Sequence, residues 1–141
     1  MPEKQRLQIS LLLLRLGVFI VMLMWTLDKF INPEHSAAVF TSFYGIANAQ
    51  SIMFFIASVE LILITAFVLG LFKRWSYGIV LILHGVSTFA SFPKYLQPWD
   101  NLLFFAAWPM LAACLALYLL RESDDLMTIK LNSKSTKGEI I

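Results

Sequence analysis

Three ionisable residues, Arg15, Glu60 and His84, lie inside three different apolar segments of this chain. A charged side chain at the centre of a bilayer costs about 2.5 to 3.5 kcal/mol on insertion scales. Such residues therefore usually face other protein groups and mark ligand or proton sites. A guanidinium and a carboxylate also form a natural bidentate pair. These residue types predict a buried polar site with Arg15, Glu60 and His84 as its candidate catalytic and binding residues.

The elements that must position these residues are long apolar helices. Of the 141 residues, 59% are hydrophobic and only 14% are charged, which is far from the balance of a soluble domain. Each apolar segment approaches the ~20 residues that cross a ~30 Å hydrocarbon core, and strand-like alternation is absent. We expect an all-α integral membrane protein, a four-transmembrane-helix bundle over residues 1–121 with helices at about 7–28, 49–72, 75–92 and 102–120. Residues 122–141 read as a polar, solvated cytoplasmic tail.

The predicted depths place all three ionisable residues in the middle layer of the membrane, at ~1.5 Å of rise per residue. Three polar groups pointing at lipid would cost more than a cluster, so we expect Arg15, Glu60 and His84 to converge. A purely structural alternative is an Arg15 to Glu60 pair that locks the first two helices, with His84 donating a hydrogen bond to a carbonyl. One histidine and one carboxylate fall short of a catalytic zinc site, and His35 lies in the outer loop, so neither metal nor haem is predicted.

The loop after the first helix has helical signals of its own. Asn32 and Pro33 resemble an N-cap and a first helical position, and Gly45 follows a run of apolar residues. We expect a short interfacial helix there. Trp25 lies at the outer boundary of the first helix, and Lys29, one turn later, can point back toward a pocket mouth.

Basic residues near the helix ends set the expected orientation. Lys4, Arg6, Lys73, Arg74 and Arg121 share one side, which places both termini in the cytoplasm. The net charge of +2 then reflects this bias and does not indicate a nucleic-acid partner. The single cysteine, Cys114, provides no disulfide or CxxC redox pair and is read as a packing residue.

Several short motifs resemble the DoxX family of small four-helix membrane proteins over roughly residues 7–121. The resemblance lies in Leu-Arg-Leu-Gly-Val-Phe at 14–19, Leu-Asp-Lys-Phe-Ile-Asn-Pro at 27–33, Val-Glu-Leu at 59–61 and Leu-Gly-Leu at 69–71. Family members have glycines before the second-helix glutamate, where this chain has Ala57 and Ser58.

The resemblance implies a role in respiratory or redox metabolism in a bacterial-type inner membrane. Related DoxD-type proteins are assigned thiosulfate:quinone oxidoreductase activity, so the resemblance implies a quinone as cofactor, with Arg15 and Glu60 in its site. His84 is added to this site by its position in this chain alone, and Lys29 and Trp25 are expected at its mouth. No cofactor motif is present, so a partner must supply electrons, and whether the isolated chain is an enzyme stays open. The alternative is a non-catalytic accessory or assembly subunit. Expected partners are membrane lipid and other membrane subunits or a homo-oligomer.

Overall fold

The computed structural model describes residues 1–131, and all regular structure in this range is helical. The α-helices are α1 (Glu3–Ile31), α2 (Pro33–Tyr44), α3 (Met53–Val68), α4 (Lys73–Ala90), α5 (Phe92–Tyr95) and α6 (Ala107–Leu119). Short 3-10 helices are η1 (Ala49–Ile52), η2 (Pro98–Asp100), η3 (Leu102–Ala106) and η4 (Arg121–Ser123). Residues 132–141, the distal half of the predicted tail, lie outside the described residues.

The corner between α1 and α2 follows from local sequence. α1 ends at Ile31, because Asn32 precedes a proline and such residues disfavour the helical region. Pro33 then opens α2, where its missing N–H costs nothing. α2 ends at Tyr44 and is capped by Gly45, whose φ of 68° is left-handed. The short helix that the sequence predicted after the first long helix is therefore present as α2.

Three helical stretches are long and apolar enough to cross a membrane: Glu3–Ile31, Ala49–Val68 and Leu102–Leu119. α4 spans 18 residues but contains Lys73, Arg74 and His84, which reduce its mean hydropathy. The described chain is thus an all-helical protein with three candidate membrane spans, as expected of a membrane protein.

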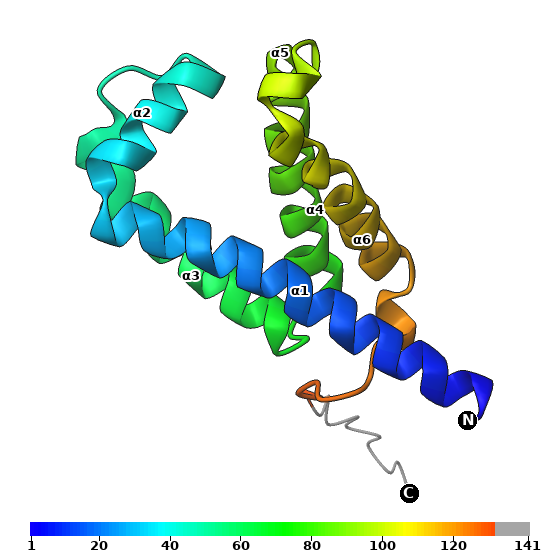
Figure 1. The fold of residues 1–141 in the computed structure, drawn as a ribbon. Coiled ribbons are helices and arrows are strands. Elements are labelled where there is room, and N and C mark those ends of the chain that lie inside the picture. Colours follow the sequence, from blue (N-terminus) through cyan, green and yellow to red (C-terminus); the bar gives the residue numbers. More distant parts are fainter. Residues whose placement is uncertain (132–141) are drawn as a thin grey trace, which may run out of the picture.

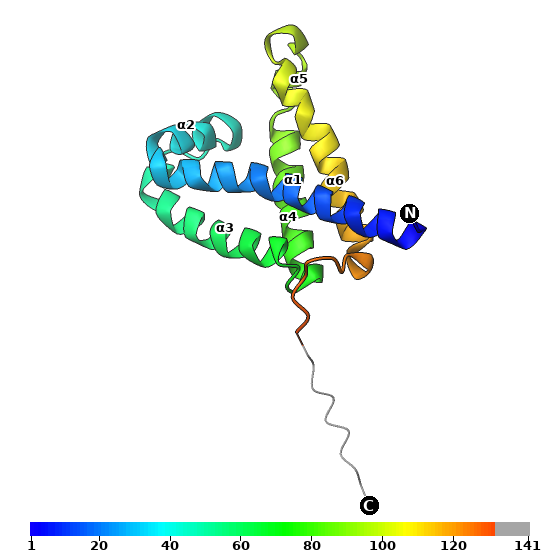
Figure 2. The same cartoon turned by 60° about the horizontal axis from the view of Figure 1, so that its bottom comes forward.

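The long helices form two antiparallel pairs that diverge from a common junction (Figure 1). α1 packs mainly on α3, and α4 packs mainly on α6. A second view shows the same divergence, with α2 at the far end of one pair and α5 at the far end of the other (Figure 2). Beyond the junction, α2 and η3 are in contact, because the rings of Phe43 and Phe104 stack with centroids 6.0 Å apart.

The core lies at the junction, where residues from all four long helices bury their side chains together. These residues are Leu11, Val18, Met22, Ile64, Phe67, Tyr77, Val80, Cys114 and Leu117. Most large apolar side chains beyond this core are exposed, as expected for helix surfaces that face lipid.

The last long helix starts differently from the expectation. The sequence predicts one helix over 102–120 with a kink beside Trp108, where Pro109 interrupts it. In the structure the first turn is 3-10 helix and α6 begins at Ala107, so Pro109 lies in the first α-helical turn. A proline is tolerated at that position because an N–H there needs no intrahelical partner.

Candidate functional site

One face of α1 carries both charged groups that the helix buries. The buried residues recur every three or four positions, so they form one stripe along the helix. They are Leu11, Arg15, Val18, Met22, Thr26 and Lys29. The two cations therefore lie on the same packed face, Arg15 near the middle of α1 and Lys29 near its C-terminal end.

Arg15 is completely buried and is bound by its own chain. Its Nη1 lies 2.9 Å from Oδ2 of Asp124, and both side chains are 0% exposed. The Tyr77 hydroxyl donates to the same Oδ2 over 2.7 Å and accepts from Nη1 over 3.3 Å. Nη2 donates to the backbone carbonyls of Leu126 and Met127. This arrangement is the Arg15–Asp124 cluster, and charge-assisted bonds of this kind are the strong ones.

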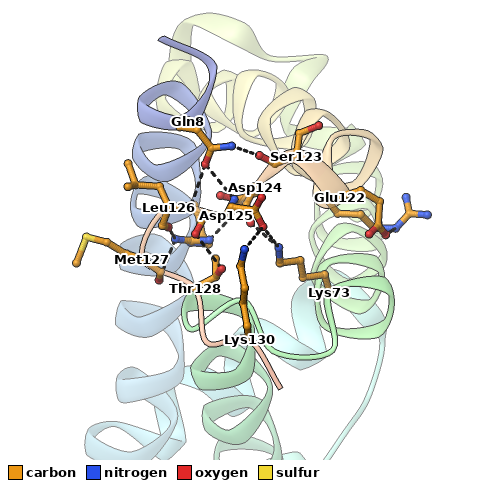
Figure 3. Close-up of polar contacts among 12 residues, drawn as sticks. Gln8, Lys73, Glu122, Ser123, Asp124, Asp125, Leu126, Met127, Thr128 and Lys130 are labelled. Carbon is orange, nitrogen blue, oxygen red and sulfur yellow. Dashed lines mark hydrogen bonds and ion pairs between the residues drawn. The ribbon is translucent and has the colours of Figure 1, made fainter. Parts of the chain in front are cut away.

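The residues that follow α6 form a C-terminal segment, residues 121–131, fastened across the junction (Figure 3). The Gln8 side chain donates to the Ser123 carbonyl and accepts from the N–H groups of Asp125 and Leu126. Lys73 Nζ donates to the Asp124 carbonyl. The segment therefore ties the beginning of α1 to the beginning of α4.

The turn between α3 and α4 receives the same segment. Gly70 follows the end of α3 and has a φ of 66°. The Gly70 N–H donates to the Phe67 carbonyl and the Leu71 N–H donates to the Ala66 carbonyl, which together form a Schellman motif. The Ile129 N–H donates to the Leu69 carbonyl over 2.9 Å. A Cβ on Gly70 would lie 2.5 Å from Cγ2 of Thr128, so only glycine permits this approach.

Two sequence-based expectations need correction here. Arg15 pairs with Asp124, so the expected Arg15 to Glu60 pair does not form. The tail was expected to be solvated, but Asp124 is among the most buried residues and the part up to residue 131 packs on the helices. Both differences have one cause: the carboxylate beside Arg15 belongs to the segment after α6, whereas Glu60 lies opposite Lys29, further along α1.

Glu60 instead pairs with Lys29. The Nζ to Oε2 distance is 2.9 Å, and the side chains are 8% and 15% exposed. Lys29 folds back along α1, and its Nζ donates to the Trp25 carbonyl over 3.1 Å. The expectation that Lys29 points back along its helix is confirmed. Glu60 Oε2 lies within ion-pair distance but has no hydrogen bond of good alignment, so the pair is held mainly by charge.

The corner beside this pair is held together by Asp28. The Asp28 carboxylate accepts from the Ser36 hydroxyl and lies near the His35 ring, each over 2.7 Å. Asp28 thereby fastens the first turn of α2 to the end of α1. Trp25 is 48% exposed, so its ring lies on the outer surface of α1.

His84 forms no hydrogen bond with either charged pair in the described residues. Its Nε2 is 2.9 Å from the Ala107 carbonyl, at the point where α6 begins. Its own carbonyl accepts from Thr88 over 2.8 Å. The structure does not bring Arg15, Glu60 and His84 into mutual contact, and His84 bonds a carbonyl as in the structural alternative.

The sequence analysis missed Asp124 and Tyr77, the partners of Arg15. The sequence did contain a signal for Asp124. Asp124 and Asp125 come shortly after the last predicted helix, which ends beside Arg121, and this end is on the same predicted side of the membrane as the start of the first helix. Within residues 1–131, no three His, Cys, Asp or Glu side chains gather where they could hold a metal ion.

Comparisons of the chain with protein-family models, curated proteins and solved structures found no match.

Proposed function

We propose that this chain is a quinone-interacting component of a membrane redox system, and that its Lys29–Glu60 pair binds the quinone headgroup. The observation that carries the proposal is this ion pair of 2.9 Å, buried between α1 and α3 in a lipid-facing helical protein. Ionisable residues inside membrane spans are costly and mark ligand and proton sites. The quinone itself comes from the resemblance to DoxX proteins, whose matching stretches at 27–33 and 59–61 contain Lys29 and Glu60.

The proposal includes α4 as a fourth membrane span. Its 18 residues extend about 27 Å, close to the thickness of a hydrocarbon core. Four of its exposed apolar residues, Ile79, Ile82, Val86 and Phe89, recur at three- and four-residue intervals and so form a stripe suited to lipid. Polar groups within α4 face partners, as His84 does with Ala107.

The proposed orientation follows from the same contacts. Gln8 contacts Ser123 and Lys73 contacts Asp124, so the beginnings of α1 and α4 lie at the end of the molecule where α6 finishes. This end carries most of the basic residues near the spans, and we place it in the cytoplasm of a bacterial-type inner membrane. The Lys29–Glu60 pair then lies toward the outer leaflet.

The residues present fit a quinone headgroup. Its carbonyl oxygens accept hydrogen bonds, and the Lys29 ammonium has three donors, of which one is hydrogen-bonded to the Trp25 carbonyl. The rings of Phe30 and Phe54 pack beside each other at the same end of α1 and α3, 6.1 Å apart. A hollow of about 540 Å³ that includes Phe54 adjoins this end, although neither Lys29 nor Glu60 lines it. A bound quinone would supply electron acceptance, and a partner protein would supply the electrons.

Arg15 and His84 are outside this proposed site. Arg15 is enclosed by its own chain, and the His84 ring is bonded to the start of α6. The site residues are thus Lys29 and Glu60, with the backbone carbonyl of Trp25 beside them.

The test is gentle purification from native membranes, followed by mass spectrometry of retained lipid-soluble molecules and protein subunits. We expect a quinone to copurify with the wild type and to be lost from Glu60→Gln. Glu122→Gln is the matched control, because it removes an exposed carboxylate at the opposite end of the protein and should retain the quinone.

Two results would overturn the proposal. One is a quinone that is retained equally by Glu60→Gln and Glu122→Gln, since the pair would then play no part in binding. The other is stoichiometric protein subunits without any quinone, which would favour an accessory or assembly role.

A further inference from the structure

A second hollow, of about 500 Å³, lies at the junction end between the start of α4 and the C-terminal segment. Lys73, Arg74 and Trp75 line it from α4, and Asp125, Thr128 and Lys130 line it from the segment. It exists only because the C-terminal segment folds back across the junction. Neither the Lys29–Glu60 pair nor the Arg15 side chain belongs to it.

Positive charge predominates in this hollow. Asp125 Oδ1 lies 3.7 Å from both Lys73 Nζ and Lys130 Nζ, so one carboxylate is shared by two ammonium groups. Glu122, which also lines the hollow, lies 3.4 Å from the Arg121 guanidinium.

Arg74 strengthens this excess. It is exposed and forms no ion pair with any residue in 1–131. The N-terminal end of α4 adds the positive end of a helix dipole. An anion would therefore be attracted to the hollow.

The rim of the hollow is apolar and exposed. Phe72 and Trp75 are 65% and 68% exposed, and Leu131 is also exposed. Phe72 has a φ of 47°, a left-handed conformation that costs a residue with a side chain about 1–2 kcal/mol. The fold thus holds the Phe72 side chain at the surface, beside the basic residues, against a backbone penalty. Exposed aromatic rings among cations are typical of the membrane interface.

We propose that this hollow binds the phosphate headgroup of an anionic phospholipid in the cytoplasmic leaflet. Lys73, Arg74 and Lys130 meet the phosphate, while Phe72, Trp75 and Leu131 contact the acyl chains near the glycerol. A phospholipid satisfies both halves of the site, whereas a soluble phosphate would leave the apolar rim in water. The inference rests on the cytoplasmic placement of this end and is independent of quinone binding.

The test is native mass spectrometry of the full chain in detergent with added phosphatidylglycerol or phosphatidylcholine. We expect at least about 10-fold preferential retention of phosphatidylglycerol by the wild type. Arg74→Gln with Lys130→Gln should reduce that retention about 10-fold, and Arg74→Lys should preserve it. Both side chains are exposed, so the double variant should keep the unfolding midpoint of the wild type.

The matched control is Lys4→Gln with Arg6→Gln, which removes two exposed cations on the same side but away from the hollow. It should change phosphatidylglycerol retention less than 2-fold. Equal losses in the two double variants would overturn the proposal, because the effect would then be general surface charge. Equal retention of the two lipids, or complete displacement of phosphatidylglycerol by millimolar inorganic phosphate, would also overturn it.

Discussion

The two buried cations of α1 lie on one face, 14 residues and so about 21 Å apart along the helix axis. Arg15 is fully enclosed and contacts a carboxylate, a phenol and two carbonyls of its own chain. Lys29 has one carboxylate and one carbonyl, and both its side chain and that of Glu60 keep some exposure. Both cations are buried, so burial alone does not distinguish a structural cluster from a candidate ligand site. The difference is that groups of the chain itself surround Arg15 completely, whereas the Lys29–Glu60 pair keeps some exposure.

The largest loss of stability should come from breaking the Arg15–Asp124 cluster. Asp124→Ala removes the carboxylate and leaves Arg15 as an unpaired buried charge, so we expect a loss of about 3–5 kcal/mol in the free energy of unfolding. Asp125→Ala removes the neighbouring, half-exposed carboxylate and should cost less than about 1 kcal/mol. Denaturant unfolding in detergent, followed by circular dichroism, measures both.

A double variant sharpens this result. Arg15→Met with Asp124→Leu removes both charges, and it should recover much of the stability lost in Asp124→Ala. If Asp124→Ala and Asp125→Ala proved equally stable, the Arg15–Asp124 cluster would have no special structural role.

The next largest effect concerns the turn that receives the C-terminal segment. Gly70→Ala should cost about 1–2 kcal/mol for its left-handed φ, with an additional penalty because Thr128 must move. Gly45→Ala is the matched control, since Gly45 also has a positive φ but open space around its Cβ position. The difference in unfolding free energy between the two variants measures the contact with Thr128, and identical losses would argue against the docked segment.

The Lys29–Glu60 pair should be less important for stability than the Arg15–Asp124 cluster. Glu60→Gln keeps the shape of the side chain and an amide oxygen that can accept from Lys29, whose side chain is only 8% exposed, so we expect a loss of about 1–2 kcal/mol in the same unfolding assay. If Glu60→Gln lost as much unfolding free energy as Asp124→Ala, the Lys29–Glu60 pair and the Arg15–Asp124 cluster would be equally structural, which would contradict the comparison.

The smallest effect should come from His84. His84→Leu removes the hydrogen bond to Ala107, and interhelical bonds of this kind in membranes average about 0.6 kcal/mol. Thr88→Val is the control, because the Thr88 hydroxyl bonds a carbonyl of its own helix. A change in unfolding free energy above about 2 kcal/mol in His84→Leu alone would indicate a larger role than a single bond.

Periodicity and turn chemistry were sufficient to predict much of the fold. Runs of apolar residues predicted the helical stretches, and Asn32, Pro33 and Gly45 predicted the extra helix, because these signals act within a few residues. The divergence of the two helix pairs was not predictable, since it depends on how side chains from four helices fit at one junction.

The partners of the buried charges were harder to predict. The sequence identifies Arg15 and Glu60 as costly residues, but a burial penalty does not specify which opposite charge relieves it. Asp124 is 109 positions from Arg15, in a stretch with no helical periodicity to fix its orientation. For Lys29 only the direction of the side chain, back along α1, was predicted, because a lysine near a helix end can reach along its own helix; its pairing with Glu60 was not predicted.

The distance in sequence between Arg15 and Asp124 has a consequence for how the protein is made. A ribosome that adds about 5–20 residues per second needs about 5–20 s to proceed from Arg15 to its carboxylate partner. During this interval the first helix has already left the ribosome with an uncompensated guanidinium. Nascent chains that stop before Asp124 should therefore remain dependent on the insertion machinery or be degraded, because Arg15 then lacks its carboxylate partner.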